Sequence, residues 1–138
     1  MFCVTRQECV IPGDGEYLYN GLYNHYCCKF SDELIGVMTP EDYDRILLVV
    51  NSTLSSLFCE GFDCLLWSIR RLLTSNKKSS LQNSSVYEPV MTIRQQLDEA
   101  NQEDCFSKRN IVWRFVIDEK KRDSYILISY IMCTEVKN

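Results

Sequence analysis

The chain has 138 residues and a mass of 16.2 kDa, with 46% hydrophobic and 25% charged side chains. This size and balance predict a single globular domain, and they exclude a large multidomain enzyme, a fibrous protein and a disordered chain. The net charge of -4 and the pI of about 5.0 give no reason to expect a nucleic-acid partner.

The N-terminal part favours extended structure. From Phe2 onward apolar and polar side chains alternate, which is typical of a strand. Residues 12–15, Pro-Gly-Asp-Gly, are a strong turn signal. A second extended stretch, rich in tyrosine, covers about residues 22–30. We expect these two stretches to pair as a hairpin with a long connection.

The strongest helix signal begins at Thr39. Threonine is a good N-cap, Pro40 suits the first helical position, and Glu41 and Asp42 place negative charge at the positive end of the helix dipole. Apolar side chains then recur at helical spacing. They are Tyr43, Ile46, Leu47, Val50, Leu54, Leu57 and Phe58. Gly61 breaks this pattern.

The rest of the chain predicts two more helices and a closing hairpin. A second apolar stripe covers residues 62–75, and a polar, exposed loop is expected at 76–86. A third helix, about residues 88–102, has four apolar side chains on one side. These are Val90, Ile93, Leu97 and Ala100. Residues 111–117 and 125–132, rich in β-branched and aromatic side chains, predict two strands joined by a charged turn.

Together these elements predict one α+β domain spanning residues 1–138. We expect an antiparallel sheet, formed by N-terminal and C-terminal hairpins, packed against about three amphipathic helices.

Charge is unevenly distributed along the chain. Residues 1–69 have three basic and ten acidic side chains, whereas residues 70–138 have twelve basic and nine acidic ones. Several basic residues of the second part are adjacent, as in Arg70–Arg71 and the run 120–122. Such pairs can attract an anionic membrane surface or an acidic protein, and the alternative is an ordinary solvated face.

Eight cysteines are the unusual feature of the composition. A disulfide framework requires an oxidising compartment, but the first residues lack the basic and apolar regions of a signal peptide. The most apolar stretch, residues 62–73, is interrupted by polar and charged side chains and is too short to span a membrane. We therefore expect a cytoplasmic protein with reduced thiols.

Catalytic motifs are not apparent in the sequence. The single histidine, His25, lies two residues from Cys27, and this spacing on a strand does not guarantee contact. The sequence lacks a nucleophile elbow, a phosphate-binding glycine loop and a zinc-protease motif. We therefore expect no enzyme activity, no cofactor and no small-molecule substrate.

A structural zinc site is an alternative role for some of the thiols. The candidate ligands lie near the predicted first hairpin. They are Cys3, Cys9, His25, Cys27 and Cys28. Their spacing is looser than that of usual zinc knuckles, and buried thiols explain these cysteines better. We therefore predict no metal site.

Cys59 and Cys64 lie where the first two predicted helices meet. Apolar and basic residues surround them in a pattern resembling a segment that lies on a membrane surface, where cysteines can be S-acylated. The candidate membrane or partner surface comprises Phe62, Leu66, Trp67, Arg70 and Arg71. The alternative is a core helix whose cysteines fill gaps.

Three blocks of the chain resemble the Golgin A7/ERF4 family, which includes the cysteine-rich hydrophobic domain proteins. Residues 29–34, Lys-Phe-Ser-Asp-Glu-Leu, are followed by a helix with an aromatic residue and an Ile/Asn pattern. Residues 2–6 are similar to the family's opening strand, which ends in an arginine. The closing hairpin, with its Trp-Arg pair, is similar to the cysteine-rich branch. The matching positions include Arg6, Phe30, Leu34, Tyr43, Asn51 and Trp113.

The resemblance implies a non-catalytic role. Family members are accessory subunits that bind and stabilise DHHC-type protein S-acyltransferases. We therefore expect a protein partner of this type, a peripheral position on the cytosolic face of the Golgi or another endomembrane, and possible acylation of Cys59 and Cys64. The alternative is a soluble protein–protein interaction module of another cytosolic assembly, which would use an exposed helix face or sheet edge.

Overall fold

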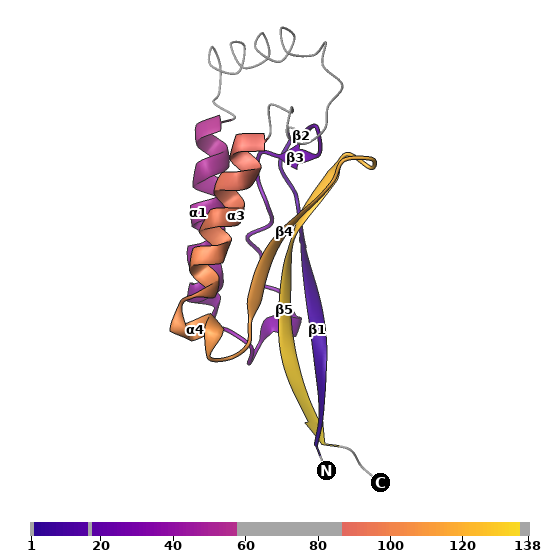
Figure 1. Cartoon of the computed structure of the whole chain (residues 1–138), viewed down its shortest axis with the longest axis vertical. Coiled ribbons are helices and arrows are strands. Elements are labelled where there is room, and N and C mark those ends of the chain that lie inside the picture. Colours follow the sequence, from indigo (N-terminus) through magenta and orange to yellow (C-terminus); the bar gives the residue numbers. More distant parts are fainter. Residues whose placement is uncertain (1, 17, 58–86, 136–138) are drawn as a thin grey trace, which may run out of the picture.

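A computed structural model describes residues 2–16, 18–57 and 87–135 of the chain (Figure 1). Its central element is an antiparallel three-stranded sheet with the strand order β1-β5-β4. The strands are β1 (Phe2–Pro12), β4 (Val112–Asp118) and β5 (Asp123–Glu135). This sheet, with helices packed against it, confirms the predicted α+β fold class.

The N-terminal strand has a different main partner from the one expected. β1 pairs with β5 along its whole length, from Phe2 opposite Glu135 to Pro12 opposite Tyr125. The extended segment at residues 22–30 meets only the end of β1, where the Cys27 N–H donates to the Pro12 carbonyl at 3.0 Å. The expected N-terminal hairpin is therefore replaced by a sheet that joins the two ends of the chain.

The sheet is wide at one end and narrow at the other. β4 pairs with β5 only from Asp118 opposite Asp123 to Val112 opposite Ser129. Beyond that point β1 and β5 continue alone as a two-stranded ribbon, which extends downward in Figure 1. The first half of β1 therefore has exposed side chains throughout, and burial begins only at Cys9.

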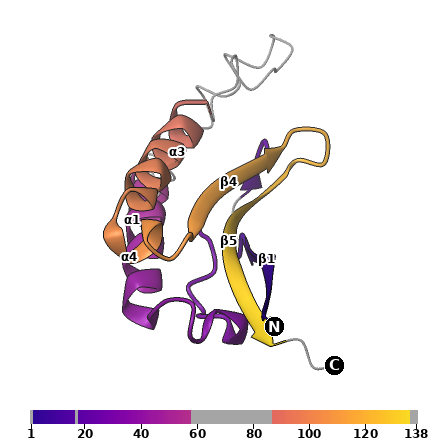
Figure 2. The same ribbon diagram turned by 60° about the horizontal axis from the view of Figure 1, so that its bottom comes forward.

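Helices cover one face of the sheet. The long helices α1 (Pro40–Leu57) and α3 (Tyr87–Asn101) lie next to each other, and a short helix, α4 (Asp104–Ser107), follows them (Figures 1 and 2). The predicted cap is confirmed, because the Asp42 N–H donates to the Thr39 hydroxyl at 3.1 Å. The predicted apolar stripe of the third helix is also buried.

The core lies between these helices and the inward side of the sheet. Side chains of a strand alternate between its two faces. On β5 the inward positions are Ser124, Ile126, Ile128 and Tyr130, and all four are buried. Trp113 of β4 lies opposite Ile128 in the register and is 1% exposed.

A small hairpin, which the sequence analysis did not separate, packs beside the wide end of the sheet. Its strands are β2 (Leu18–Tyr19) and β3 (Leu22–Tyr23). The two residues between them, Asn20 and Gly21, both have positive φ, 49° and 91°. Asn-Gly is the preferred pair for such a turn because both residues tolerate the left-handed region. A 3-10 helix (Asp32–Leu34) then leads toward α1.

Two predicted elements, the helix at 62–75 and the loop at 76–86, lie outside the described residues. Within the described part of the chain, no helix is both long and apolar enough to cross a membrane.

Candidate functional site

Most of the positions that carry the family resemblance lie in the core. The Phe30 ring lies edge-on to Tyr43 with a centroid distance of 5.5 Å, and Tyr43 lies 6.1 Å from Trp113. Leu34 is fully buried in the same core. These positions join the segment before α1, α1 itself and the sheet. Arg6 is separate from them, because it lies on the exposed part of β1 opposite Ile131.

Asn51 is the polar member of this group, and it fixes the segment before α1. Its side-chain oxygen accepts the Tyr26 N–H at 2.9 Å, and its amide N–H donates to the Tyr26 carbonyl at 3.1 Å. The same amide nitrogen lies 3.3 Å from Cys28 Sγ. Because Asn51 is only 8% exposed, these bonds satisfy backbone groups that water would reach poorly. One helical side chain therefore holds both backbone groups of Tyr26.

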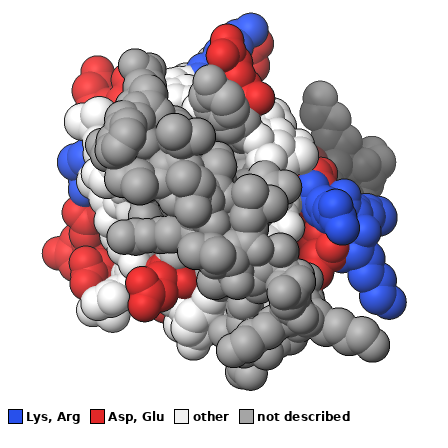
Figure 3. Space-filling model, turned by 90° about the horizontal axis from the view of Figure 1, so that it is seen from above, with Lys and Arg blue, Asp and Glu red and all other residues white. Residues whose placement is uncertain are grey.

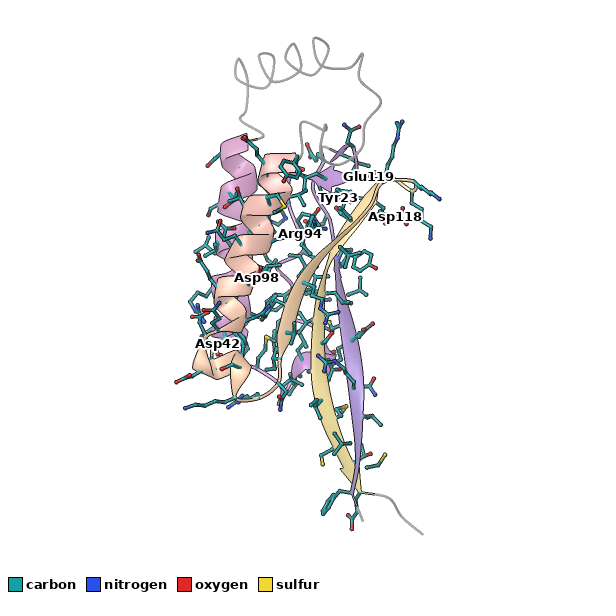
Figure 4. All side chains as sticks on the ribbon, in the orientation of Figure 1. Tyr23, Asp42, Arg94, Asp98, Asp118 and Glu119 are labelled. Atoms are coloured by element: carbon teal, nitrogen blue, oxygen red, sulfur yellow. The ribbon has the colours of Figure 1, made fainter. Side chains whose placement is uncertain are left out.

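Tyr26 itself connects this segment to the sheet. Its ring lies edge-on to Phe115 of β4 at 5.6 Å, and its hydroxyl hydrogen-bonds to Ser124 of β5. The neighbouring Tyr23 donates its hydroxyl proton to Asp123 at 2.9 Å, and Figure 4 shows it at the end of the β4–β5 hairpin. The segment that precedes α1 is thus attached to both β4 and β5.

The candidate membrane surface and acylation sites are not part of the described chain. Cys59, Cys64 and the neighbouring positions lie outside the described residues. The undescribed positions of that surface are Phe62, Leu66, Trp67, Arg70 and Arg71. Their predicted roles therefore stay predictions.

A second group of polar side chains lies where the end of β1 meets residues 25–28. Two backbone N–H groups, of Asp14 and Gly15, donate to the His25 carbonyl at 3.0 and 3.2 Å. Glycine is needed beside this contact, because a Cβ on Gly15 would lie 2.8 Å from the His25 backbone nitrogen. The predicted turn at residues 12–15 is therefore a close backbone pairing that holds His25 in place.

The His25 ring connects a carboxylate and a thiol. Its Nδ1 lies 2.5 Å from Asp14 Oδ1, and its Nε2 lies 3.7 Å from Cys28 Sγ. An ionised carboxylate only accepts hydrogen bonds, so in the neutral imidazole Nδ1 carries the proton and Nε2 is left as an acceptor. The spacing along a strand suggested Cys27 as the partner of His25, but the structure places Cys28 there instead.

The environment of Cys28 keeps its sulfur protonated at rest. Although the residue as a whole is exposed, partial desolvation of its sulfur is the main influence and raises the pKa of the Cys28 thiol. The hydrogen bond from Asn51 opposes this rise because it stabilises the thiolate, whereas the charges of Asp14, Cys27 and Asp44 raise the pKa further. A base that removes this proton would therefore favour a reaction of the thiol.

Among the residues considered for zinc, Cys3 lies apart from the others, whereas Cys9 and Cys27 line one pocket and His25 contacts Cys28. Cys3 lies on the two-stranded ribbon opposite Thr134, far along β1 from Cys9, which is buried. Burial raises the pKa of the Cys9 thiol to about 12, with a further rise from Glu33. In the part of the chain that the structure describes, no group of three or more His, Cys, Asp or Glu side chains could hold a metal ion.

The sheet face away from the helices is open. The register places Val4, Arg6, Glu8 and Val10 of β1 on this face, and two of them, Val4 and Val10, are 62% and 54% exposed. β1 also has a free edge, because its only partner strand in the described sheet is β5. Exposed apolar side chains beside an unpaired strand edge are features through which a protein can bind a partner.

Charged side chains of both signs surround the wide end of the molecule. Viewed from above in Figure 3, a group of basic side chains lies on the right next to acidic ones, and further acidic side chains lie on the left and lower left. The turn between β4 and β5 contributes both signs, from Asp118 and Glu119 to Lys120, Lys121 and Arg122.

Comparison of the chain with protein-family models, with curated proteins and with solved structures finds no match.

Proposed function

We propose that the protein is a non-catalytic accessory subunit, which binds and stabilises a membrane-bound DHHC-type protein S-acyltransferase on the cytosolic face of the Golgi or another endomembrane. One observation carries this proposal. Residues that are scattered along the chain and carry the family resemblance pack together in the core, as Phe30, Tyr43 and Trp113 do.

This packing supports the proposal because a short motif match can arise by chance in unrelated folds. Large apolar side chains meet in the core of any domain, so the polar Asn51 is the more specific part of this packing. Phe30, Tyr43 and Trp113 come from three different parts of the chain, and Asn51 holds the same segment through Tyr26. A motif whose residues fix one common core is the pattern expected of members of one fold family.

The open sheet face is the surface that suits a protein partner. Val4 and Val10 expose apolar area that no described helix covers, and Arg6 and Glu8 lie between them with opposite charges. Removing the valines from water would stabilise a complex, while the charges would favour one orientation of the partner. Binding to the folded form alone would also raise the apparent stability of both proteins.

The partner can be tested by affinity purification of the full chain, with a tag, from its native cells in mild detergent. We expect a multi-spanning protein with an Asp-His-His-Cys motif in stoichiometric amount. If the stoichiometric partners contain no protein of this type, the proposal is wrong.

Two surface variants show whether the open face makes the contact. Val10→Glu introduces a charge on the open face, and Leu48→Glu introduces the same charge on α1, where Leu48 is 67% exposed. We expect Val10→Glu to lose the acyltransferase and Leu48→Glu to keep it, with both variants folded. Equal recovery with both variants would place the contact elsewhere.

A soluble interaction module is the second candidate, and the free edge of β1 is the observation that favours it. An extended peptide could add to this edge through backbone hydrogen bonds, without any membrane. Fractionation distinguishes the two candidates. The module predicts that the full chain stays in the soluble fraction, whether or not Cys59 and Cys64 are replaced by serine.

A further inference from the structure

We propose that Cys28 is a nucleophilic thiol that accepts an acyl group from a thioester, with His25 as its general base and Asp14 as the residue that positions the imidazole. The proposal concerns a single transfer to the protein itself, and it does not depend on the proposed accessory role. It rests on three side chains at hydrogen-bonding positions and on the backbone that holds them.

The order of the three groups is the one that proton transfer requires. Asp14 accepts the Nδ1 proton at 2.5 Å, which leaves the Nε2 lone pair 3.7 Å from Cys28 Sγ. A thiol, an imidazole and a carboxylate in this order form an activated nucleophile on several unrelated folds. The contact to sulfur is long for a hydrogen bond, as is usual for catalytic groups before a substrate binds.

The backbone holds this geometry independently of the three side chains. The His25 carbonyl accepts two N–H groups from residues 14 and 15, and Cys27 N–H donates to Pro12. On the other side, Asn51 of α1 bonds both backbone groups of Tyr26. Residues 25–27 are thus fixed between β1 and α1, and such preorganisation is what a reactive site needs.

Exposure makes the thiol accessible to a reactant. Cys28 is exposed, whereas Cys9 is buried and Cys27 is partly buried. Two other described cysteines, Cys3 and Cys133, are also exposed. Since His25 is the only histidine in the chain, neither of them can have an imidazole base from this protein. Cys3 and Cys133 are therefore internal references for an unassisted surface thiol.

A thioester is an electrophile with which the step balances without any further reactant. His25 Nε2 takes the proton of Cys28 as the sulfur attacks the thioester carbonyl, and the C–S bond to the donor thiol breaks. The leaving thiolate then takes that proton back from His25. One thioester is exchanged for another, so no oxidant, reductant or water is consumed, and a thiolate leaves more readily than an alkoxide or an amine.

The Asn51 N–H adds stabilisation at the step where the sulfur becomes negative. It lies 3.3 Å from Cys28 Sγ and favours the thiolate. The charges near this sulfur act in the other direction, and they come from Asp14, Cys27 and Asp44. Removal of the proton by His25 during the attack therefore matters more than a thiolate formed in advance.

Alkylation measures the reactivity of each thiol. The full chain is treated briefly with iodoacetamide at neutral pH, and the modified cysteines are located by mass spectrometry. We expect Cys28 to react at least about tenfold faster than Cys3 and Cys133, since general-base assistance is worth about a hundredfold or more in favourable sites. His25→Gln should reduce the Cys28 rate to that of Cys133.

The role of Asp14 has a spectroscopic test that a purely structural role would not pass. With one histidine in the chain, a long-range proton–nitrogen NMR spectrum reports His25 alone. We expect the Nδ1–H tautomer in the natural protein and the Nε2–H tautomer in Asp14→Ala. The same variant should slow the alkylation of Cys28 about tenfold.

Acyl transfer is tested with acetyl-coenzyme A as the probe. We expect one acetyl group on Cys28, removable by hydroxylamine, in the natural chain and in the matched variant Cys27→Ser. Cys28→Ser and His25→Gln should not be acetylated at this position. Circular dichroism confirms that each variant is folded.

Three results would overturn the proposal. The first is alkylation of Cys28 no faster than that of Cys133. The second is an unchanged Cys28 rate in folded His25→Gln. The third is acetylation that is absent, or spread equally over the exposed cysteines. Failure of the affinity purification, by contrast, would remove only the accessory role.

Discussion

The two faces of the sheet differ although the same strands build both. On the covered face Cys9, Ile11 and Ile126 are at most 3% exposed. On the open face Val4 and Val10 of the same β1 strand are more than half exposed, with charged residues between them. The covered face holds the fold together, whereas the open face is available for contacts with another molecule.

This difference shows how the alternation of buried and exposed side chains fixes the pairing register of a strand. A strand with one buried face is fixed in register, because a shift by one residue would bring the open face inward. In β5 the inward residues from Ser124 to Tyr130 define that register. Beyond Tyr130 every residue to Glu135 is exposed, and pairing with β1 alone keeps the ribbon ordered.

The largest effect is expected on the covered face, from Trp113→Ala. Trp113 is 1% exposed and contacts the rings of Tyr43 and Phe106. Removing a buried indole should lower the free energy of unfolding by about 3–5 kcal/mol. Val112→Ala, on the opposite face of the same strand, is the control and should cost about 1 kcal/mol or less. Urea unfolding measures both, and equal losses would contradict the difference between the faces.

A slightly smaller effect is expected for Asn51→Ala. The change leaves the N–H and the carbonyl of the buried Tyr26 without their partner, and each orphaned group costs about 1–3 kcal/mol. We expect a total loss of about 2–4 kcal/mol in the free energy of unfolding. Ser52→Ala, at the next and exposed position of α1, should change it by less than about 0.5 kcal/mol. A stable Asn51→Ala would mean that the segment before α1 is held by other contacts.

Alkaline pH should lower the free energy of unfolding, because Tyr26, which packs against the covered side of the sheet, becomes ionised. Burial raises the pKa of Tyr26 to about 12, whereas its ordinary value is 10.0. The folded state therefore favours the protonated phenol, so this stability is complete below about pH 10 and is lost as the pH rises to about 12. We expect a decrease of about 2 kcal/mol from this group.

Urea unfolding at about pH 9 and at about pH 11.5 measures the alkaline loss. Tyr26→Phe removes the ionising group, so its stability should change less between these two pH values than that of the natural chain. If both proteins lose the same stability, Tyr26 is not the group that titrates.

Helices α1 and α3 and the closing hairpin were predictable because their signals are local. Thr39 caps α1 as expected, and the apolar spacing of α3 identified its buried face. The pairing of β1 was not predictable in the same way. Phe2 lies opposite Glu135 in the register, and nothing in the residues near either one specifies so distant a partner. Asn20-Gly21, in contrast, is a local signal for the β2–β3 hairpin, which was not among the predicted elements.

Only part of the candidate site could be predicted from the sequence. Simple alternation along a strand would place Cys27, two residues from His25, on the same side as the histidine. Residues 25–28 are not a regular strand, because Asn51 bonds both backbone groups of Tyr26. This local geometry brings Cys28 to the imidazole instead. A contact that depends on a helix twenty-five residues away cannot be deduced from spacing alone.

The smallest expected effects compare the two faces within one strand, at Ile11 and Val4. Ile11 is 3% exposed opposite Ile126, so Ile11→Val leaves a gap the size of a methyl group and should cost about 1 kcal/mol. Val4 is 62% exposed, so Val4→Thr exchanges one solvated β-branched side chain for another and should change stability by less than about 0.5 kcal/mol. The midpoints of urea unfolding provide the comparison. If Val4→Thr costs as much as Ile11→Val in the purified chain, the open face is already covered, and a second copy of the protein becomes the first candidate for what covers it.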